Sequence, residues 1–398
     1  MLKTPVYLDY NATTPCDPRV LEVMLPYFTQ HFGNAASRSH PYGWVAEEAV
    51  DIARDQVAKL IGADAQEVIF TSGATEADNL ALNGVLQAYH NKGNHIITCT
   101  TEHKAVLDTC AWLEKQGASV TYVNVNSEGL IDLRELEAAI RPTTILIAIM
   151  YANNETGVLQ PVKVISQIAR QHGVLFFCDA TQAVGKIAVN VNTDGIDLMA
   201  FSAHKMYGPK GIGALYVRRK NPRVKIVAQI HGGGHERGLR SGTLNVPGIA
   251  GFGKACEIAM LEMGAESSRL QPLRDKLESA LLQLDAASVN GSRQQRLAHV
   301  TNLSFQYAES EGLITSLNRH LAVSSGSACT SASMEPSHVL KALGLEDDLA
   351  KSSIRFSLGR YTTAEEIDFV IEQVILAVQQ LREASPLWKM YKQDIDVS

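Results

Sequence analysis

Seven short apolar runs between about residues 65 and 220 constrain the fold of this chain more than any other feature. The runs lie at 68–70, 95–98, 120–125, 145–150, 174–177, 198–201 and 214–217. They alternate with stretches that have the spacing of amphipathic helices, such as 162–172. Short apolar strands that alternate with helices are typical of a mainly parallel sheet with helices on both faces. We therefore predict an α/β domain built on such a sheet.

The pattern changes beyond residue 256. The elements predicted there are a long polar, amphipathic helix, two separated strands and a last helix, at 257–284, 302–305, 353–358 and 365–382 respectively. A chain of 398 residues is long enough for two domains. We therefore predict a large domain over 13–256 and a smaller α+β domain made of 1–12 and 257–398.

Composition excludes several classes of protein. The formal net charge of -6 argues against a nucleic-acid platform. The N-terminal segment lacks the apolar core of a signal peptide, and no apolar run is long enough to span a bilayer, so we expect a cytoplasmic protein without a membrane partner. The six cysteines are scattered without a CxxC pair, which fits neither a disulfide framework nor a zinc site. We expect no metal.

Polar residues that draw attention follow the apolar runs directly. They are Thr75, His103, Asn154, Asp179 and Lys205. Ligands of parallel sheets collect at the carboxyl ends of the strands. This placement predicts a ligand site along one edge of the sheet.

The stretch Ser202-Ala203-His204-Lys205 ends one predicted strand and precedes the glycine-rich segment 208–213. A lysine there suits an amine held against a carbonyl cofactor, and Ser202 and His204 can hydrogen-bond a phosphate. Pyridoxal phosphate fits this combination. The alternative is a solvated surface lysine, because most lysines beside glycine loops are of that kind.

The stretch 72–76 follows another strand and opens a helix. Such a turn presents backbone N–H groups and the positive end of a helix dipole, which a phosphate needs. An ordinary helix N-cap is the alternative.

Four further polar residues suit a pyridine cofactor, and each has a structural alternative. Asp179 can keep a ring nitrogen protonated and Gln182 can reach a ring hydroxyl, although Asp179 could also be a helix N-cap. His103 could stack on the ring face and move protons, although a lone histidine is more often structural. Asn154 suits a ring oxygen or a substrate carboxylate, or is a turn residue.

Cys329 lies in a run of small residues, 324–333, with no bulky side chain to bury it. Such composition is typical of a mobile, exposed loop, which we place at about 323–335. A thiol is only a few per cent thiolate at neutral pH, but that fraction is strongly nucleophilic. An exposed cysteine without a role is a liability, so we predict a functional role for Cys329.

Arg355 alternates with apolar residues in a predicted strand, which indicates partial burial. A buried guanidinium needs an anion, either a substrate carboxylate or the partner in a structural salt bridge. The glycine-rich, basic loop 232–243 could bind a phosphate of its own site or of a neighbouring subunit. The sequence leaves both pairs of alternatives open.

Six stretches together match one family: 7–15, 71–76, 101–104, 179–182, 231–237 and 324–331. The chain resembles the cysteine desulfurases, class V aminotransferase enzymes of pyridoxal-phosphate fold type I, and specifically their housekeeping iron-sulfur-cluster type. The resemblance covers nearly the whole chain. It implies a homodimer that converts L-cysteine to L-alanine and takes the sulfur onto Cys329 as a persulfide.

The resemblance also implies roles for single residues. Lys205 would bond the cofactor, and Lys205 and His103 would move protons. The phosphate would be held by Ala74, Thr75, Ser202 and His204, with Thr243 from the other subunit. The ring nitrogen, ring oxygen and ring face would meet Asp179, Gln182 and His103, and the substrate carboxylate would meet Arg355 and Asn154.

The sulfur acceptor stays open: it could be an iron-sulfur scaffold, a transfer-RNA thiolation enzyme, or both. Alternatives to the main interpretation are a selenocysteine lyase or another class V aminotransferase-like enzyme, for which Cys329 would be incidental or specialised. A non-catalytic scaffold of the same fold would be expected to lack the lysine, the aspartate or the thiol, yet all three are present. The chain departs from the usual sequence of this family at Ala203, where glycine is usual, without losing a reacting group.

Overall fold

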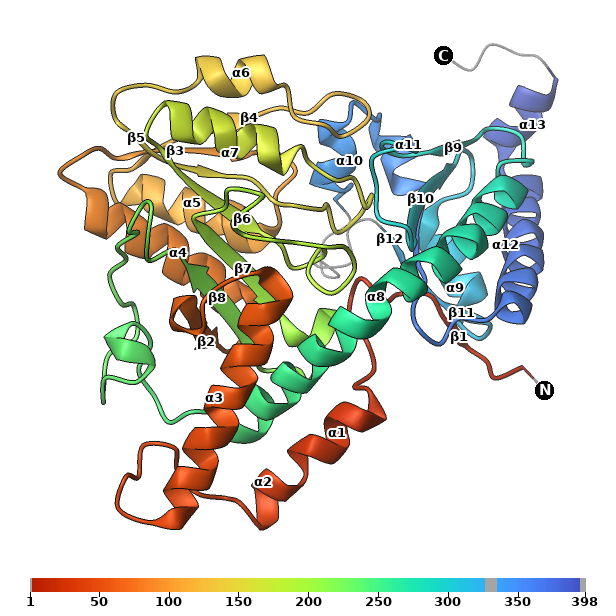
Figure 1. Ribbon diagram of the computed structural model, residues 1–398. Coiled ribbons are helices and arrows are strands. Elements are labelled where there is room, and N and C mark those ends of the chain that lie inside the picture. The colour runs from red at the N-terminus through yellow and green to blue at the C-terminus, as the bar shows by residue number, and fades with distance from the viewer. Residues whose placement is uncertain (1, 326–334, 394–398) are drawn as a thin grey trace.

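Seven strands form the central sheet of the computed structural model, which describes residues 2–325 and 335–393 (Figure 1). Their spatial order is β2 (Val68–Thr71), β8 (Gly213–Val217), β7 (Leu198–Ser202), β6 (Leu175–Asp179), β5 (Thr144–Ala148), β3 (His95–Cys99) and β4 (Ser119–Val123). Strand β8 is antiparallel to both of its neighbours, and the other pairs are parallel. The predicted mainly parallel sheet is confirmed.

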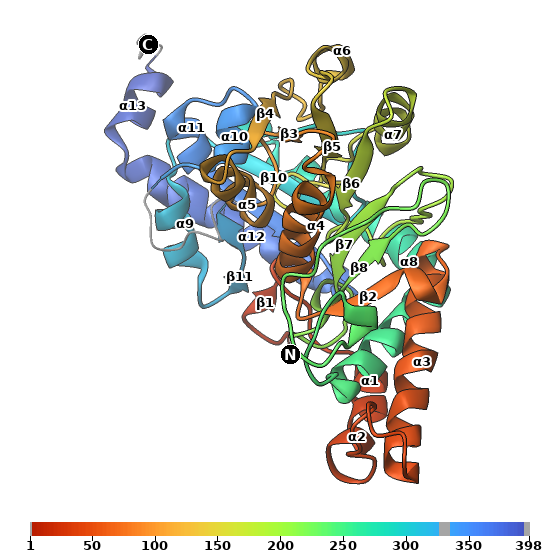
Figure 2. The ribbon, with the colours of Figure 1, turned by 90° about the vertical axis from the view of Figure 1, so that its left-hand side faces the viewer.

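Helices cover both faces of this sheet, as Figure 2 shows. Helices α4 (Ala74–Tyr89) and α5 (Lys104–Lys115) pack on one face, and α3 (Pro41–Ile61), α7 (Val162–Gln171) and part of α8 (Val246–Leu281) pack on the other. Successive residues of a strand point to opposite faces. Ile69 therefore joins the apolar cluster under α4, whereas Phe70 joins the cluster under α3 and α8. Burial on both faces explains why these strands are continuous apolar runs.

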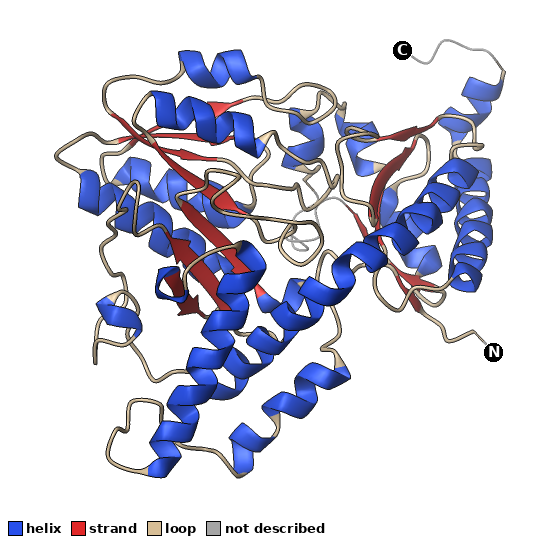
Figure 3. Ribbon diagram, viewed as in Figure 1, coloured by secondary structure: helices blue, strands red, loops and turns tan. Residues whose placement is uncertain are grey.

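A smaller antiparallel sheet lies beside the first, at the right of Figures 1 and 3. Its order is β12 (Ser324–Ser325), β13 (Ser353–Ser357), β10 (Val300–Phe305) and β9 (Ala287–Val289). Its core contains residues of α8, α9 (Ser310–Leu317) and α12 (Ala364–Ala384). Strand β1 (Val6–Tyr7) joins the same core by pairing in parallel with β11 (Leu321–Ala322). This pairing is consistent with the predicted assignment of residues 1–12 to the small domain, which we keep as a proposal.

Helix α8 starts earlier than the sequence predicts. We expected it from residue 257, but it begins at Val246 and continues through the proposed boundary at residue 256. Its first turns are buried against α3 and the large sheet on several sides, so they lack an amphipathic pattern. Pro386 marked the end of the last predicted helix, yet it occupies the first turn of a further helix, α13 (Pro386–Lys392).

The remaining elements are short. They are α1 (Pro18–Met24), α2 (Pro26–Thr29), α6 (Leu133–Ala138), α10 (His338–Ala342), α11 (Asp347–Lys351) and the 3-10 turns η1 (Ala65–Glu67), η2 (Ala203–Lys205) and η3 (Glu236–Gly238). Within residues 2–325 and 335–393, none of the helices combines the length and the apolar character that crossing a bilayer requires.

Candidate active site

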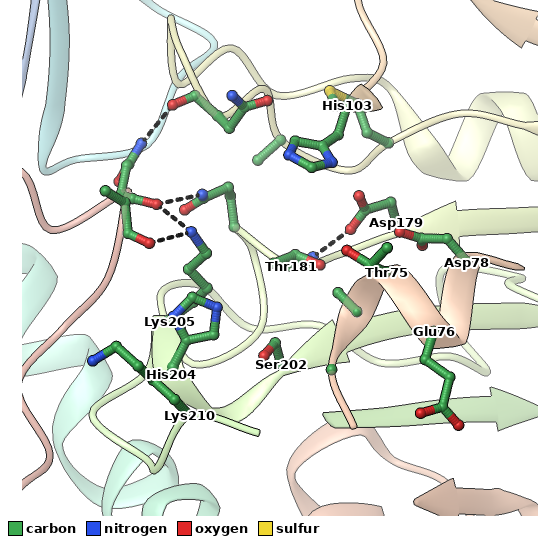
Figure 4. A pocket seen from close by; sticks show the side chains of 18 of the residues that line it. Thr75, Glu76, Asp78, His103, Asp179, Thr181, Ser202, His204, Lys205 and Lys210 are labelled. Carbon is green, nitrogen blue, oxygen red and sulfur yellow. Dashed lines mark hydrogen bonds between the residues drawn. The ribbon is translucent and has the colours of Figure 1, made fainter. Parts of the chain in front are cut away.

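A cavity of about 470 Å³ lies at the carboxyl ends of the parallel strands (Figure 4). Ten of the residues that the sequence analysis selects line it: Ala74, Thr75, His103, Asn154, Asp179, Gln182, Ser202, His204, Lys205 and Arg355. Thr243 does not line the cavity and is exposed. Cys329 lies outside the described residues. The fold therefore gathers the predicted groups of several strand ends, while their roles stay predictions.

One end of the cavity is formed by the start of α4, directly after β2. Gly73 precedes the helix, and the first N–H groups of a helix have no acceptor within it. Gly213 of β8 lets this turn pack closely, because a Cβ at residue 213 would lie 2.7 Å from the Cα of Gly73. Helix start and strand end thus form a cradle of N–H donors suited to a phosphate.

His204 and Ser202 stand beside this cradle. His204 Nδ1 lies 3.1 Å from Thr13 Oγ1. Burial, followed by the charges of Lys205 and Lys210, lowers the pKa of His204 to about 4. The imidazole is therefore neutral at pH 7. It can hydrogen-bond a phosphate without adding a positive charge.

Asp179 closes β6 and faces the cavity. Its Oδ1 accepts a hydrogen bond from the Thr181 N–H at 2.9 Å, and the segment that follows is a series of turns, so Asp179 is not a helix N-cap. Two further carboxyls, Asp78 and Glu102, are buried nearby. Burial, and then the charge of Asp179, raises the pKa of Asp78 well above its usual value, and burial does the same for Glu102. The neutral forms of Asp78 and Glu102 are therefore favoured.

His103 is the N-cap of α5, and Figure 4 shows its ring pointing into the cavity. Its Nδ1 accepts a hydrogen bond from the Ala105 N–H at 3.1 Å. An accepting Nδ1 carries no proton, so the neutral ring holds its proton on Nε2. The structural alternative and the functional prediction are thus compatible for this residue.

Lys205 follows β7 at the end of η2. Its Nζ donates to the backbone carbonyls of Asn11 and Ala12, both at 2.6 Å. The carbonyl of Asn11 also accepts from Gln182 Nε2 at 3.0 Å. This bond occupies the donor end of the Gln182 amide and leaves its Oε1 buried without a partner. That acceptor is the group a ring hydroxyl needs.

Arg355 of β13 closes the cavity from the side of the smaller sheet. It is 2% exposed, more deeply buried than predicted. Its Nη2 pairs with Asp9 Oδ1 at 2.6 Å, and its Nη1 donates to the Asn154 carbonyl at 2.9 Å. The structural salt bridge that the sequence left open is therefore present. The Nε of Arg355 is nevertheless buried without a partner.

Unpaired polar atoms concentrate at this cavity. Among the described residues, buried side-chain atoms without a hydrogen-bond partner include both carboxyl oxygens of Asp78, Thr181 Oγ1, Gln182 Oε1 and Arg355 Nε. All four residues line the cavity. Buried polar groups are normally paired, so this concentration fits a polar ligand that supplies the partners. The helix start, the carboxylate and the lysine fit pyridoxal phosphate in particular.

The basic loop 232–243 is less free than its sequence suggests. Arg240 pairs with Glu76 at 2.7 Å, and Arg237 donates to the Val68 carbonyl at 2.6 Å. Glu236 in the same loop forms a buried ion pair with Arg54 at 2.7 Å. The arginines of the loop are thus satisfied within their own chain and do not form an open phosphate site.

Sequence reasoning assigned no role to Asn11, Asp9 or Asp78. Asn11 and Asp9 lie in the stretch 7–15, which was used only as a whole. Asn11 resembles an ordinary turn residue, and its contacts come from segments far along the chain. Asp78 sits inside a helix one turn after the cradle, where a carboxyl that faces the sheet is an unusual choice. A carboxyl at this position of the helix is the one feature of the sequence that could have indicated a role for Asp78.

Comparisons with known proteins agree on one family. The model of the class-V aminotransferases matches residues 6–370. The chain is 58% identical to the cysteine desulfurase IscS of Pectobacterium carotovorum subsp. carotovorum (strain PC1) over 399 residues, covering 100% of this chain and 98% of that protein. It is 59% identical to the cysteine desulfurase IscS of Actinobacillus succinogenes, with the same coverage.

Solved structures are similar over most of the chain. A NifS-like protein superposes with a TM-score of 0.88 at 38% identity, covering 94% of this chain and 99% of that one. A structure titled SspA in complex with cysteine has a TM-score of 0.79 at 37% identity, covering 90% of this chain and 100% of that one.

Proposed function

We propose a course of reaction from the premise that this chain belongs to the class-V aminotransferase family and, within it, to the cysteine desulfurases. The enzyme acts on L-cysteine and leaves L-alanine. In the proposal, the sulfur passes to Cys329 as a persulfide and from there to an acceptor protein. The observation that carries the proposal is that Lys205, Asp179 and the start of α4 line one cavity.

The family depends on pyridoxal phosphate, and the cavity residues fit that cofactor. When bound, it supplies an electron sink for the carbon atoms of the amino acid. We propose that Ala74 and Thr75 hold its phosphate, together with neutral His204 and Ser202. Asp179 would face the ring nitrogen, Gln182 Oε1 would accept from the ring hydroxyl, and His103 would cover the ring face.

Arg355 and Asn154 are the proposed carboxylate site for L-cysteine. Asp9 and the Asn154 carbonyl fix the guanidinium of Arg355 at two of its nitrogens, while its Nε remains for a further acceptor. The pairing with Asp9 holds the guanidinium in one orientation without using its whole fork of donors. Asn154 lines the same cavity.

Lys205 and His103 are the proposed proton carriers. The two carbonyls at 2.6 Å favour the protonated amine of Lys205 when it is not bonded to the cofactor. The ring of His103 is oriented by the Ala105 N–H, so that a proton moves at Nε2. The two groups approach the cavity from different strand ends.

A homodimer is the proposed assembly. Large apolar side chains are exposed on α2, on α3 and on the segments beside α2: Leu25, Phe28, Phe32, Trp44 and Ile52. These elements lie at the bottom of Figure 1. Exposed apolar patches of this kind mark interaction sites. Thr243 is exposed and absent from its own cavity, as expected of a residue that serves a partner's phosphate.

We further propose a cytoplasmic enzyme whose sulfur acceptors are an iron-sulfur scaffold, a transfer-RNA thiolation enzyme, or both. A selenocysteine lyase is the second candidate activity. It would use the same cavity but would not need Cys329 to take sulfur from L-cysteine.

The test is product release from L-cysteine by the protein loaded with pyridoxal phosphate, in the presence of a thiol reductant. We expect equal amounts of alanine and sulfide. Cys329→Ala should lose both products and keep the cofactor absorbance, whereas Cys16→Ala, a control at a cysteine that is partly exposed, should keep activity. Sulfur transfer from L-cysteine by Cys329→Ala would refute the persulfide step.

A further inference from the structure

Asn11 uses every polar group it has. It is 1% exposed. Its backbone N–H donates to Ser357 Oγ at 2.9 Å, and its Nδ2 donates to the Asn154 carbonyl at 3.1 Å. Its Oδ1 lies 3.0 Å from His299 Nε2. Its backbone carbonyl accepts from Gln182 and Lys205. One turn residue thus joins β13 and the segment before β10 to three parts of the cavity wall.

The orientation of the Asn11 amide follows from its partners. The Asn154 carbonyl can only accept, so it must face the NH2 end of the amide. The other end is then an oxygen, and His299 Nε2 must donate to it. Burial, followed by the charges of Lys186 and Arg274, lowers the pKa of His299 well below its usual value, so the ring is neutral. The side-chain amide of Asn11 is therefore locked in one orientation by one donor, His299 Nε2, and one acceptor, the Asn154 carbonyl.

This lock fixes the backbone that meets the Lys205 amine. The carbonyls of Asn11 and Ala12 both point at Nζ, at 2.6 Å. A protonated amine held by two carbonyls is stabilised by charge-assisted hydrogen bonds, which are stronger than neutral ones. An amine that is bonded to a cofactor carbon has fewer protons to donate. The pair of carbonyls is therefore matched to the detached form of Lys205.

We propose that Asn11, held by His299, is a positioning residue that directs these two carbonyls at the detached amine of Lys205. It thereby favours the state in which the substrate, rather than Lys205, is bonded to the cofactor. The inference rests on the proposed function and extends it to a residue that touches Lys205 only through the backbone. Protons balance in the exchange: the incoming amine arrives as an ammonium, a carbon–nitrogen bond to it replaces the one to Lys205, and Lys205 leaves as an ammonium.

The test measures how readily a small amine displaces Lys205. The loaded protein is titrated with an amine and treated with borohydride, and mass spectrometry gives the fraction of Lys205 that carries the reduced cofactor. Two amines are used: L-alanine, and ethylamine, which is alanine without its carboxylate. The variants are Asn11→Ala and Asn11→Asp. The control is Asn94→Ala, which loses one exposed amide hydrogen bond to a backbone carbonyl elsewhere.

We expect the half-displacing concentration of both amines to rise about tenfold in Asn11→Ala, the size of one lost hydrogen bond to a charged group. Asn94→Ala should match the wild type. Asn11→Asp keeps the volume but replaces the donor to Asn154 by a charged oxygen that only accepts and is repelled by the Asn154 carbonyl, so it tests the lock if the alanine variant does not fold. We expect a rise in the same direction.

The ethylamine titration separates this proposal from a general disturbance of the site. A variant that only misplaces Arg355 through Asn154 would raise the alanine value and leave the ethylamine value unchanged. That result in both variants would overturn the proposal. If the wild type itself traps no cofactor on Lys205, the proposed function fails before the inference about Asn11 is reached.

Discussion

Replacing Glu155 by glutamine should stabilise this protein progressively as the pH rises. Glu155 is 4% exposed, and its Oε2 accepts from Ser337 Oγ at 2.5 Å. Burial raises the pKa of Glu155 from 4.5 to about 7, against the lowering effects of Ser337, Arg355 and His103. The residue lies between the substrate side of the cavity and α10, so its charge is costly in the folded protein.

The sign follows from the raised pKa. The folded state holds the proton more tightly than the unfolded state, so stability is greatest below pH 4.5 and falls until the pH passes about 7. The two pKa values differ by about 2.5, and at about 1.4 kcal/mol per pH unit the full cost is about 3.5 kcal/mol. About 2–3 kcal/mol of this loss of folding stability should occur between pH 5 and pH 8.

The assay is the thermal midpoint of wild type and Glu155→Gln at pH 5 and pH 8. An unfolding entropy of about 2 cal/mol/K per residue gives about 0.8 kcal/mol/K for this chain, so the variant should gain about 3 °C on the wild type between the two pH values. Packing changes that are independent of pH cancel in this difference. Glu383→Gln, at an exposed glutamate of α12, is the control. Equal pH dependence in wild type and Glu155→Gln would refute the reasoning.

Three other changes test the structure at separate points. Arg355→Lys removes the forked guanidinium that Asp9 orients, so the KM for L-cysteine should rise about 10- to 100-fold while the cofactor absorbance is kept. An unchanged KM would show that Arg355 is not part of the substrate site. Lys186 is buried, its Nζ has no hydrogen-bond partner, and burial lowers its pKa to about 8. Lys186→Met should therefore raise the thermal midpoint at pH 7 by a few degrees, and this gain should vanish above pH 10.5. A gain that is constant with pH would show that the buried charge of Lys186 is not its cause. Glu236→Ala leaves Arg54 buried without its carboxylate, so unfolding should become easier by about 3–5 kcal/mol, and adding Arg54→Met should recover part of the loss in the same calorimetric experiment.

The sheet could be predicted because its strands obey local rules. Strands that are buried on both faces are apolar runs, and the turns that end them carry glycine and polar residues. The start of α8 could not be predicted in the same way. The six consecutive residues 248–253 of α8 are all buried, and six residues of a helix cover all of its sides, so no polar face marks the start of the helix. Buried helices without an amphipathic pattern are indistinguishable from loops rich in glycine and alanine.

The candidate site could be predicted only in part for a related reason. Lys205 and Asp179 could be selected from the sequence because each directly follows an apolar run. Asn11 has contacts that are 143 to 346 residues distant in the sequence, and nothing in its neighbourhood indicates them. The pairing of Arg355 with Asp9 spans the same distance. Such contacts depend on how two sheets are placed against each other, which short patterns do not contain.

The parallel pairing of β1 with β11 has a consequence for the order of events on the ribosome. Val6 can pair with Leu321, and Asn11 can donate to Ser357, only after those later residues have been synthesised. At about 5–20 residues per second, the nascent segment 6–12 spends roughly 15 to 60 s without its partners, and the strands of the large sheet are synthesised within that interval. The wall of the cavity that meets Lys205 therefore assembles late in translation, and a nascent chain gains a complete cofactor site only after residue 357 has been synthesised.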